Sequence, residues 1–117
     1  MKSMQENEII EKMPSSETVL TVSDAFRQLG DPSRLRIFWL LCHCEECVIN
    51  IATATEMSSP AVSHHLRLLK NAKLITSTRH GKEMYYRAAD SPMVEKLHHT
   101  IEEIAKISCP EWHDKFS

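Results

Sequence analysis

Three cysteines and a histidine lie within six positions of this sequence, in the stretch LCHCEECVIN at residues 41–50. The chain has one further cysteine, Cys109. Thiolates bind soft and borderline metal ions, and thiols also carry out redox chemistry. In a reducing compartment, clustered thiols point first to one of these two functions and second to plain packing in the core.

The spacing of Cys44 and Cys47 suits a shared metal ion. Three positions apart, they would face the same side of a helix, and a turn would also bring them together. Two sulfurs leave the coordination of Cd(II), Pb(II), As(III), Cu(I) or Zn(II) incomplete. Cys109 is expected as a third ligand and Cys42 as a further candidate. Weaker candidates are His43, His113 and the N-terminal arm.

Other interpretations of the thiols stay open. Cys42 shares a helical face with Leu35 and Phe38 and could be a buried apolar thiol, while Cys47 could lie in the core. A redox or reactive-sulfur switch would pair Cys109 with one of the clustered cysteines. A structural zinc knuckle would need four dependable ligands close in sequence. A thiol enzyme, with His43 as base, is not expected, because neighbouring side chains on a helix diverge and no orienting acid is suitably spaced.

The chain of 117 residues is long enough for one compact domain. Because only two of its residues are glycine, we expect that domain to be mainly helical. The longest apolar run, residues 37–42, is far too short to span a membrane, and the N-terminus is too polar for a secretory signal. We therefore expect a cytoplasmic protein without membrane contact.

Charge is distributed unevenly along the chain. The net charge is only −2, but residues 58–88 contain six basic residues against one acidic residue, Glu83. The flanking segments 1–31 and 90–117 each contain three basic and six acidic residues. A basic block between acidic flanks is typical of a face that binds a polyanion, although a solvated basic surface would look the same.

Apolar spacing and start signals predict the helices. Val19, Val22, Phe26 and Leu29 recur at helical intervals, and Gly30 ends this first helix. Asp31 before Pro32 predicts the start of a second helix, which runs to the cysteine cluster with Leu35, Phe38, Leu41 and Cys42 inward. A short third helix is expected at VINIATATE, residues 48–56.

The next segments predict a DNA-reading unit. Ser59 is expected to cap a fourth helix whose core line is Val62, Leu66 and Leu69, with polar side chains on the opposite face. Residues 74–88 read as a β-hairpin with a basic tip, and a final helix begins near Ser91 and Pro92 and ends by SCP, residues 108–110. This order predicts a mainly α winged helix-turn-helix that binds double-stranded DNA. The expected DNA-contacting residues are Ser58, Ser59, Ser63, His64, His65, Arg67, Arg79 and Lys82.

The first and last helices carry narrow apolar stripes. The last one contains Val94, Leu97, Ile101 and Ile104. We expect the two stripes to form a homodimer seam, the alternative being packing within one subunit. A two-fold dimer would place its reading helices about 34 Å apart and prefer a palindrome. The expected organisation is a flexible arm at 1–15, the DNA-binding and dimerisation domain at 16–108, and a tail at 109–117.

Four stretches, DPSRLRIFWLL, CVINIA, SSPAVSHHLRLLKNAKLI and RHGKEMYYRAAD, resemble the ArsR/SmtB family of bacterial metalloregulatory repressors. The resemblance covers roughly residues 18–108. It implies a homodimer that blocks an operator and releases it when an inducer, in many members a thiophilic or borderline metal ion, binds.

Two family metal sites can be compared with this chain residue by residue. Where the family has Cys-Val-Cys, this chain has Cys47, Val48 and Ile49, with its extra thiols upstream. The family's site on the last helix would fall on Asp90, Pro92, Glu103 and Lys106, of which two are not metal ligands. The expected inducer site is therefore the cysteine cluster.

Overall fold

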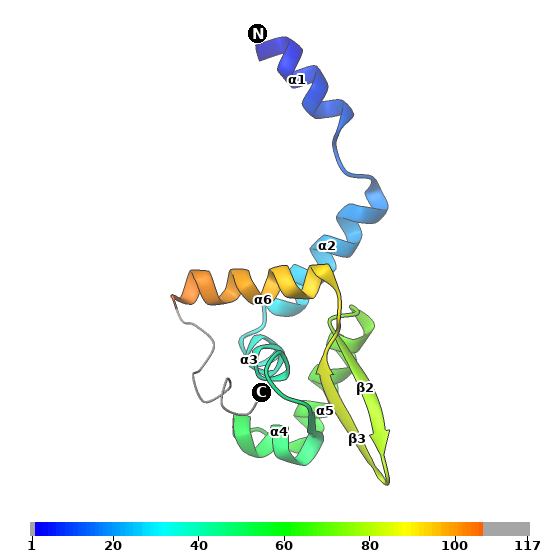
Figure 1. Ribbon diagram of the computed structural model, residues 1–117, viewed down its shortest axis with the longest axis vertical. Coiled ribbons are helices and arrows are strands. Elements are labelled where there is room, and N and C mark those ends of the chain that lie inside the picture. Colours follow the sequence, from blue (N-terminus) through cyan, green and yellow to red (C-terminus); the bar gives the residue numbers. More distant parts are fainter. Residues whose placement is uncertain (1, 107–117) are drawn as a thin grey trace.

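The computed structural model describes residues 2–106, which form helices and one small sheet. Figure 1 shows the helices α3 to α6 and the sheet gathered together, with α1 standing away from them. No helix in the described residues is long and apolar enough to cross a membrane. The elements in chain order are α1 (Lys2–Glu11), α2 (Ser16–Leu29), α3 (Pro32–Leu41), β1 (Glu46–Cys47), α4 (Val48–Thr55), α5 (Ser59–Asn71), β2 (Ile75–His80), β3 (Glu83–Ala88) and α6 (Pro92–Ala105).

Side-chain caps begin four of the helices. Ser15, Asp31, Ser58 and Ser91 each accept a hydrogen bond from the backbone N–H three residues later. Proline lies in the first turn of α3, α5 and α6, where its missing N–H costs nothing. The cap of α5 is Ser58 rather than the predicted Ser59, which is already the first helical residue.

The predicted hairpin is present, but it belongs to a three-stranded sheet. Strands β2 and β3 pair antiparallel from Ile75↔Ala88 to His80↔Glu83. The two-residue turn between them begins at Gly81, whose φ of +66° suits glycine. The third strand, β1, was not predicted; it pairs with the other edge of β3, where Cys47 faces Tyr85.

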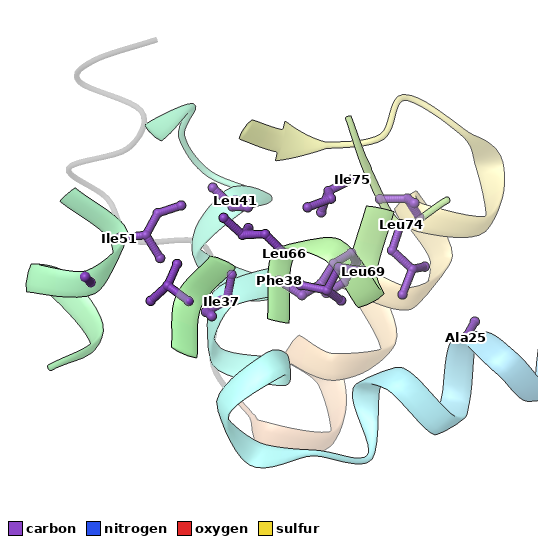
Figure 2. Close-up of a cluster of buried hydrophobic side chains, with 12 residues drawn as sticks. Ala25, Ile37, Phe38, Leu41, Ile51, Leu66, Leu69, Leu74 and Ile75 are labelled. Carbon is purple, nitrogen blue, oxygen red and sulfur yellow. The ribbon is translucent and has the colours of Figure 1, made fainter. Parts of the chain in front are cut away.

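The core lies where α3, α4, α5 and the start of β2 meet (Figure 2). The predicted line Val62, Leu66 and Leu69 is at most 1% exposed, which confirms the inward face of α5. On α3, Phe38 and Leu41 are buried as predicted, whereas Leu35 and Cys42 are half-buried. The fully buried core side chains are Ile37, Phe38, Leu41, Ile51, Val62, Leu66, Leu69, Leu74 and Ile75.

The N-terminal segment contains a helix, and the last helix ends earlier than predicted. Within the segment predicted as an arm, residues 2–11 form helix α1, and every side chain from residue 5 to 15 is exposed. At the other end, α6 stops at Ala105, where Lys106 adopts a left-handed conformation with φ of 58°. This is short of the predicted end at SCP; the expected tail at 109–117, with Cys109 and His113, lies outside the described residues.

Replacing Leu66 with alanine should lower the free energy of unfolding by about 2–5 kcal/mol, because it leaves a cavity in the centre of the core. Urea unfolding at one fixed protein concentration, followed by circular dichroism, measures the loss. The control is Ile49→Ala, at a side chain on α4 that is 61% exposed; its effect should stay within about 0.5 kcal/mol. Similar losses for the two variants would contradict this assignment of the core.

Candidate functional site

Helices α4 and α5 form a helix-turn-helix. The turn between them is short because Glu56 takes a left-handed conformation, with φ of 57°, directly after α4. The buried line of α5 faces the core, so its opposite face is turned to solvent. The exposed side chains of that face are Ser59, Pro60, Ser63, His64, Arg67 and Lys70.

Two contacts organise this exposed face. The guanidinium of Arg67 donates to Nδ1 of His64 across 3.0 Å. An arginine can only donate, so His64 Nδ1 accepts and the ring's proton lies on Nε2, which is then available as a donor. Lys70 Nζ donates to Ser77 Oγ across 2.6 Å, which joins α5 to strand β2.

His65 lies apart from the exposed face, although sequence reasoning grouped it with the DNA contacts. Its Nδ1 is 3.3 Å from Arg34 Nη1, and Arg34 in turn donates from Nε to the carbonyl of Gln28 across 2.9 Å. Partial burial lowers the pKa of His65, an effect that the nearby Asp31 carboxylate opposes. The structure thus places His65 in a polar link between α5 and α3.

The predicted basic residues of the hairpin are at its tip. Arg79 and Lys82 are exposed on either side of Gly81. The neighbouring His80 packs its ring edge-on against Tyr85, at 4.9 Å between centroids, and its Nε2 lies 3.7 Å from Glu45 Oε1. Exposed cations on a hairpin next to an exposed polar helix face can contact two parts of a duplex backbone.

The three described cysteines follow the end of α3, but they are not equivalent. Cys42 and Cys44 are half-buried and line a cavity of about 300 Å³. Cys47 is 7% exposed, precedes α4 and does not line this cavity. The third thiol predicted as a ligand by sequence, Cys109, lies outside the described residues.

Cys44 is held as a thiol rather than poised as a thiolate. Its Sγ lies 3.4 Å from the carbonyl of Leu40 and donates to it. Burial raises the pKa of Cys44, and the charge of Glu46 adds to the effect. A metal ion bound here must therefore displace a proton that the surroundings favour.

A different set of ligand atoms converges in the part of the chain that the structure describes. His43, His98 and Glu102 each offer one atom, and these atoms lie within 4.8 Å of one another. The cysteines form no such group of three between residues 2 and 106. Of these three residues the sequence predicted only His43, as a weak ligand candidate; the four-residue spacing of His98 and Glu102 is the signal in the sequence that indicates the other two.

The pattern of the arsR family of bacterial regulatory proteins matches residues 31–77. The chain is 36% identical over 87 residues to the transcriptional repressor SmtB homolog of Synechocystis, a match covering 74% of this chain and 66% of that protein. It is 34% identical to the cadmium resistance transcriptional regulatory protein CadC homolog of Staphylococcus aureus, covering 80% of each. The match to SmtB of Mycobacterium tuberculosis spans only 57% of that relative's length.

Solved structures show the same architecture. The homodimeric winged helix-turn-helix DNA-binding domain Mb0332 of Mycobacterium bovis, described as a possible ArsR-family regulator, superposes with a TM-score of 0.69 at 31% identity. That match covers 81% of this chain and 89% of the other. With the helix-turn-helix, the three-stranded sheet and these relatives together, the chain belongs to the arsR family of bacterial transcription regulators and has a winged helix-turn-helix fold.

Proposed function

We propose that the protein is a homodimeric repressor that binds a palindromic operator through α5 and the β2–β3 hairpin, and releases it when a metal ion binds. The observation that carries DNA binding is the two-sided character of α5. One face is locked into the core by Val62, Leu66 and Leu69, so the serine, histidine and arginine side chains opposite must face solvent. Such groups hydrogen-bond phosphates and base edges in a major groove.

The contact between Lys70 and Ser77 supports a joint role for α5 and the hairpin. It links the middle of strand β2 to the reading helix and so limits the movement of Arg79 and Lys82 relative to Arg67. We assign Ser59, Ser63, His64 and Arg67 to the major groove and the hairpin cations to the neighbouring backbone. Ser58 serves first as the cap of α5, and His65 acts through its link to α3 rather than by touching DNA.

Exposed apolar side chains support the homodimer. On α2, the side chains of Val19, Val22 and Phe26 are 48%, 44% and 61% exposed. On α6, Ile104 is 78% exposed and Ile101 is half-buried. Apolar stripes of this kind are covered in a stable protein, and a second copy of the chain covers both at once.

Metal response is supported by the relatives, one of which is named for cadmium resistance. Two positions in this chain could take the ion: the cysteine cluster, where Cys42 and Cys44 line a cavity, and the histidine cluster at the end of α3. The raised pKa of Cys44 counts against this thiol as the reactive cysteine of a redox switch, because a protonated thiol is a poor nucleophile.

The function is tested by selecting duplexes from a random library with the full-length, metal-free protein. We expect enrichment of an inverted repeat whose half-sites are about one helical turn apart. Enrichment of no sequence, or of one without two-fold symmetry, would contradict the proposal.

Replacing Arg67 or Lys82 with alanine should weaken binding to the selected duplex and lower the slope of log affinity against log salt by about one, because each removes a phosphate contact. Fluorescence anisotropy at several salt concentrations measures both quantities. Lys96→Ala is the matched control for Lys82→Ala, since Lys96 is an exposed lysine on α6. An equal effect of the two lysine substitutions would argue against a specific role for the hairpin.

Replacing Phe26 with aspartate should convert the dimer to a monomer, because it places a charge in the middle of the apolar stripe. Sedimentation equilibrium gives the molecular mass. Ile49→Asp changes another exposed apolar residue, on α4, and should leave the dimer intact. A wild-type protein that sediments as a monomer would refute the seam outright.

A further inference from the structure

We infer that His43, His98 and Glu102 bind a borderline divalent transition-metal ion, of the class of Zn²⁺, Co²⁺ and Ni²⁺, within a single subunit. This deepens the proposed function and rests on it for its regulatory meaning, since it gives the repressor a nitrogen and oxygen ligand set in place of a thiolate one. The ligand atoms would be Nε2 of both histidines and Oε2 of the glutamate.

The three atoms form a nearly equilateral triangle. His98 Nε2 lies 3.0 Å from His43 Nε2 and 2.9 Å from Glu102 Oε2, and His43 Nε2 lies 3.2 Å from the same oxygen. For metal bonds of about 2.0–2.1 Å, ligand atoms are about 2.9 Å apart at right angles and about 3.3 Å apart in a tetrahedron. The observed separations lie in this range.

When Glu102 is ionised, hydrogen bonds cannot satisfy all three pairs of atoms in the triangle. Each Nε2 carries either one proton or one lone pair, and an ionised carboxylate oxygen only accepts. If both histidines donate to Glu102, two N–H groups face each other across 3.0 Å. If only one donates, a nitrogen lone pair faces the carboxylate oxygen. A cation just outside the plane of the triangle, bound to all three atoms, satisfies the three lone pairs together.

The surroundings suit a bound ion. The side chains of His43, His98 and Glu102 are 2%, 21% and 12% exposed. A carboxylate so shielded from water is stabilised by a nearby positive charge. Trp39 Nε1 lies 3.3 Å from Glu102 Oε2 and donates to it, and the Trp39 ring packs 4.3 Å from that of His43. Such contacts around a metal site hold its ligands in position.

His98 also lines the cavity of about 300 Å³ that Cys42 and Cys44 border. The cavity gives an ion a way in from the side of His98, the most exposed of the three. Two imidazoles and a carboxylate favour borderline ions over the soft ions that thiolates prefer.

The site also joins two elements with different roles. His43 lies two residues after α3, which packs against the reading helix α5 through the common core, whereas His98 and Glu102 lie on α6, part of the proposed dimer seam. An ion here would fix the angle between the DNA-reading core and the seam, and so the spacing of the two reading helices in a dimer.

The test is a titration of the reduced, full-length protein with Co²⁺, in which binding is measured from the visible ligand-field bands. Competition between Zn²⁺ and the bound Co²⁺ then gives the affinity for Zn²⁺. His98→Ala and Glu102→Gln should each lower the Co²⁺ affinity at least about tenfold. His99→Ala and Glu103→Gln are matched controls, because this pair has the same four-residue spacing but is 74% and 70% exposed, with 3.6 Å between its nearest atoms. Neither control should change the affinity.

Unchanged Co²⁺ affinity in His98→Ala and Glu102→Gln would overturn the site, as would binding that Cys44→Ser abolishes while His98→Ala retains it. Circular dichroism melting of each metal-free variant checks that it is folded. Metal binding is measured without DNA, so a failure of the metal site can be distinguished from a failure of the proposed repressor function. A protein that binds Co²⁺ as described but enriches no duplex refutes the repressor and leaves the metal site standing.

Discussion

The anchoring of α5 by its buried apolar line is the constraint on which the rest of the molecule depends. A helix whose residues 62, 66 and 69 are sealed in the core cannot rotate about its axis, because doing so would expose three large apolar side chains at once. The polar residues between them therefore have a fixed direction. Helix α3 provides part of the opposing surface with Ile37, Phe38 and Leu41, so the orientation of the reading helix is set by the same packing that stabilises the domain.

The sequence predicted the elements whose signals are local. Asp31 before Pro32, and Ser58 and Ser59 before Pro60, indicate where α3 and α5 begin, because these side chains can cap a helix. The spacing of Val62, Leu66 and Leu69 predicts the inward face of α5. Gly81 between two β-rich runs is enough to predict the hairpin. The adjacent Ser58 and Ser59 are equally good caps by composition, and which of them caps depends on where the preceding left-handed residue, Glu56, ends α4.

Features that depend on distant contacts were missed. Strand β1 has two residues, and no pattern of its own marks it; it exists because β3, about forty positions later, offers an edge at Tyr85 and Tyr86. Helix α1 was not predicted because its apolar residues do not recur at helical intervals. His65 falls beside the exposed face on a helical wheel, but a contact with Arg34, 31 positions away, turns it toward α3. The convergence of His43 with His98 and Glu102 joins residues 55 and 59 positions apart, a crossing of α3 and α6 that only the folded chain reveals.

The short strand β1 has a mechanical consequence. Cys47 pairs with Tyr85 in the middle of strand β3 and is also the N-cap residue of α4, so the hairpin and the first helix of the helix-turn-helix are joined at one residue. A movement of either one therefore acts on the pairing of β1 with β3. In the proposed repressor, an operator would meet the hairpin and this helix as one unit, and the ease with which its base steps bend would then contribute to recognition.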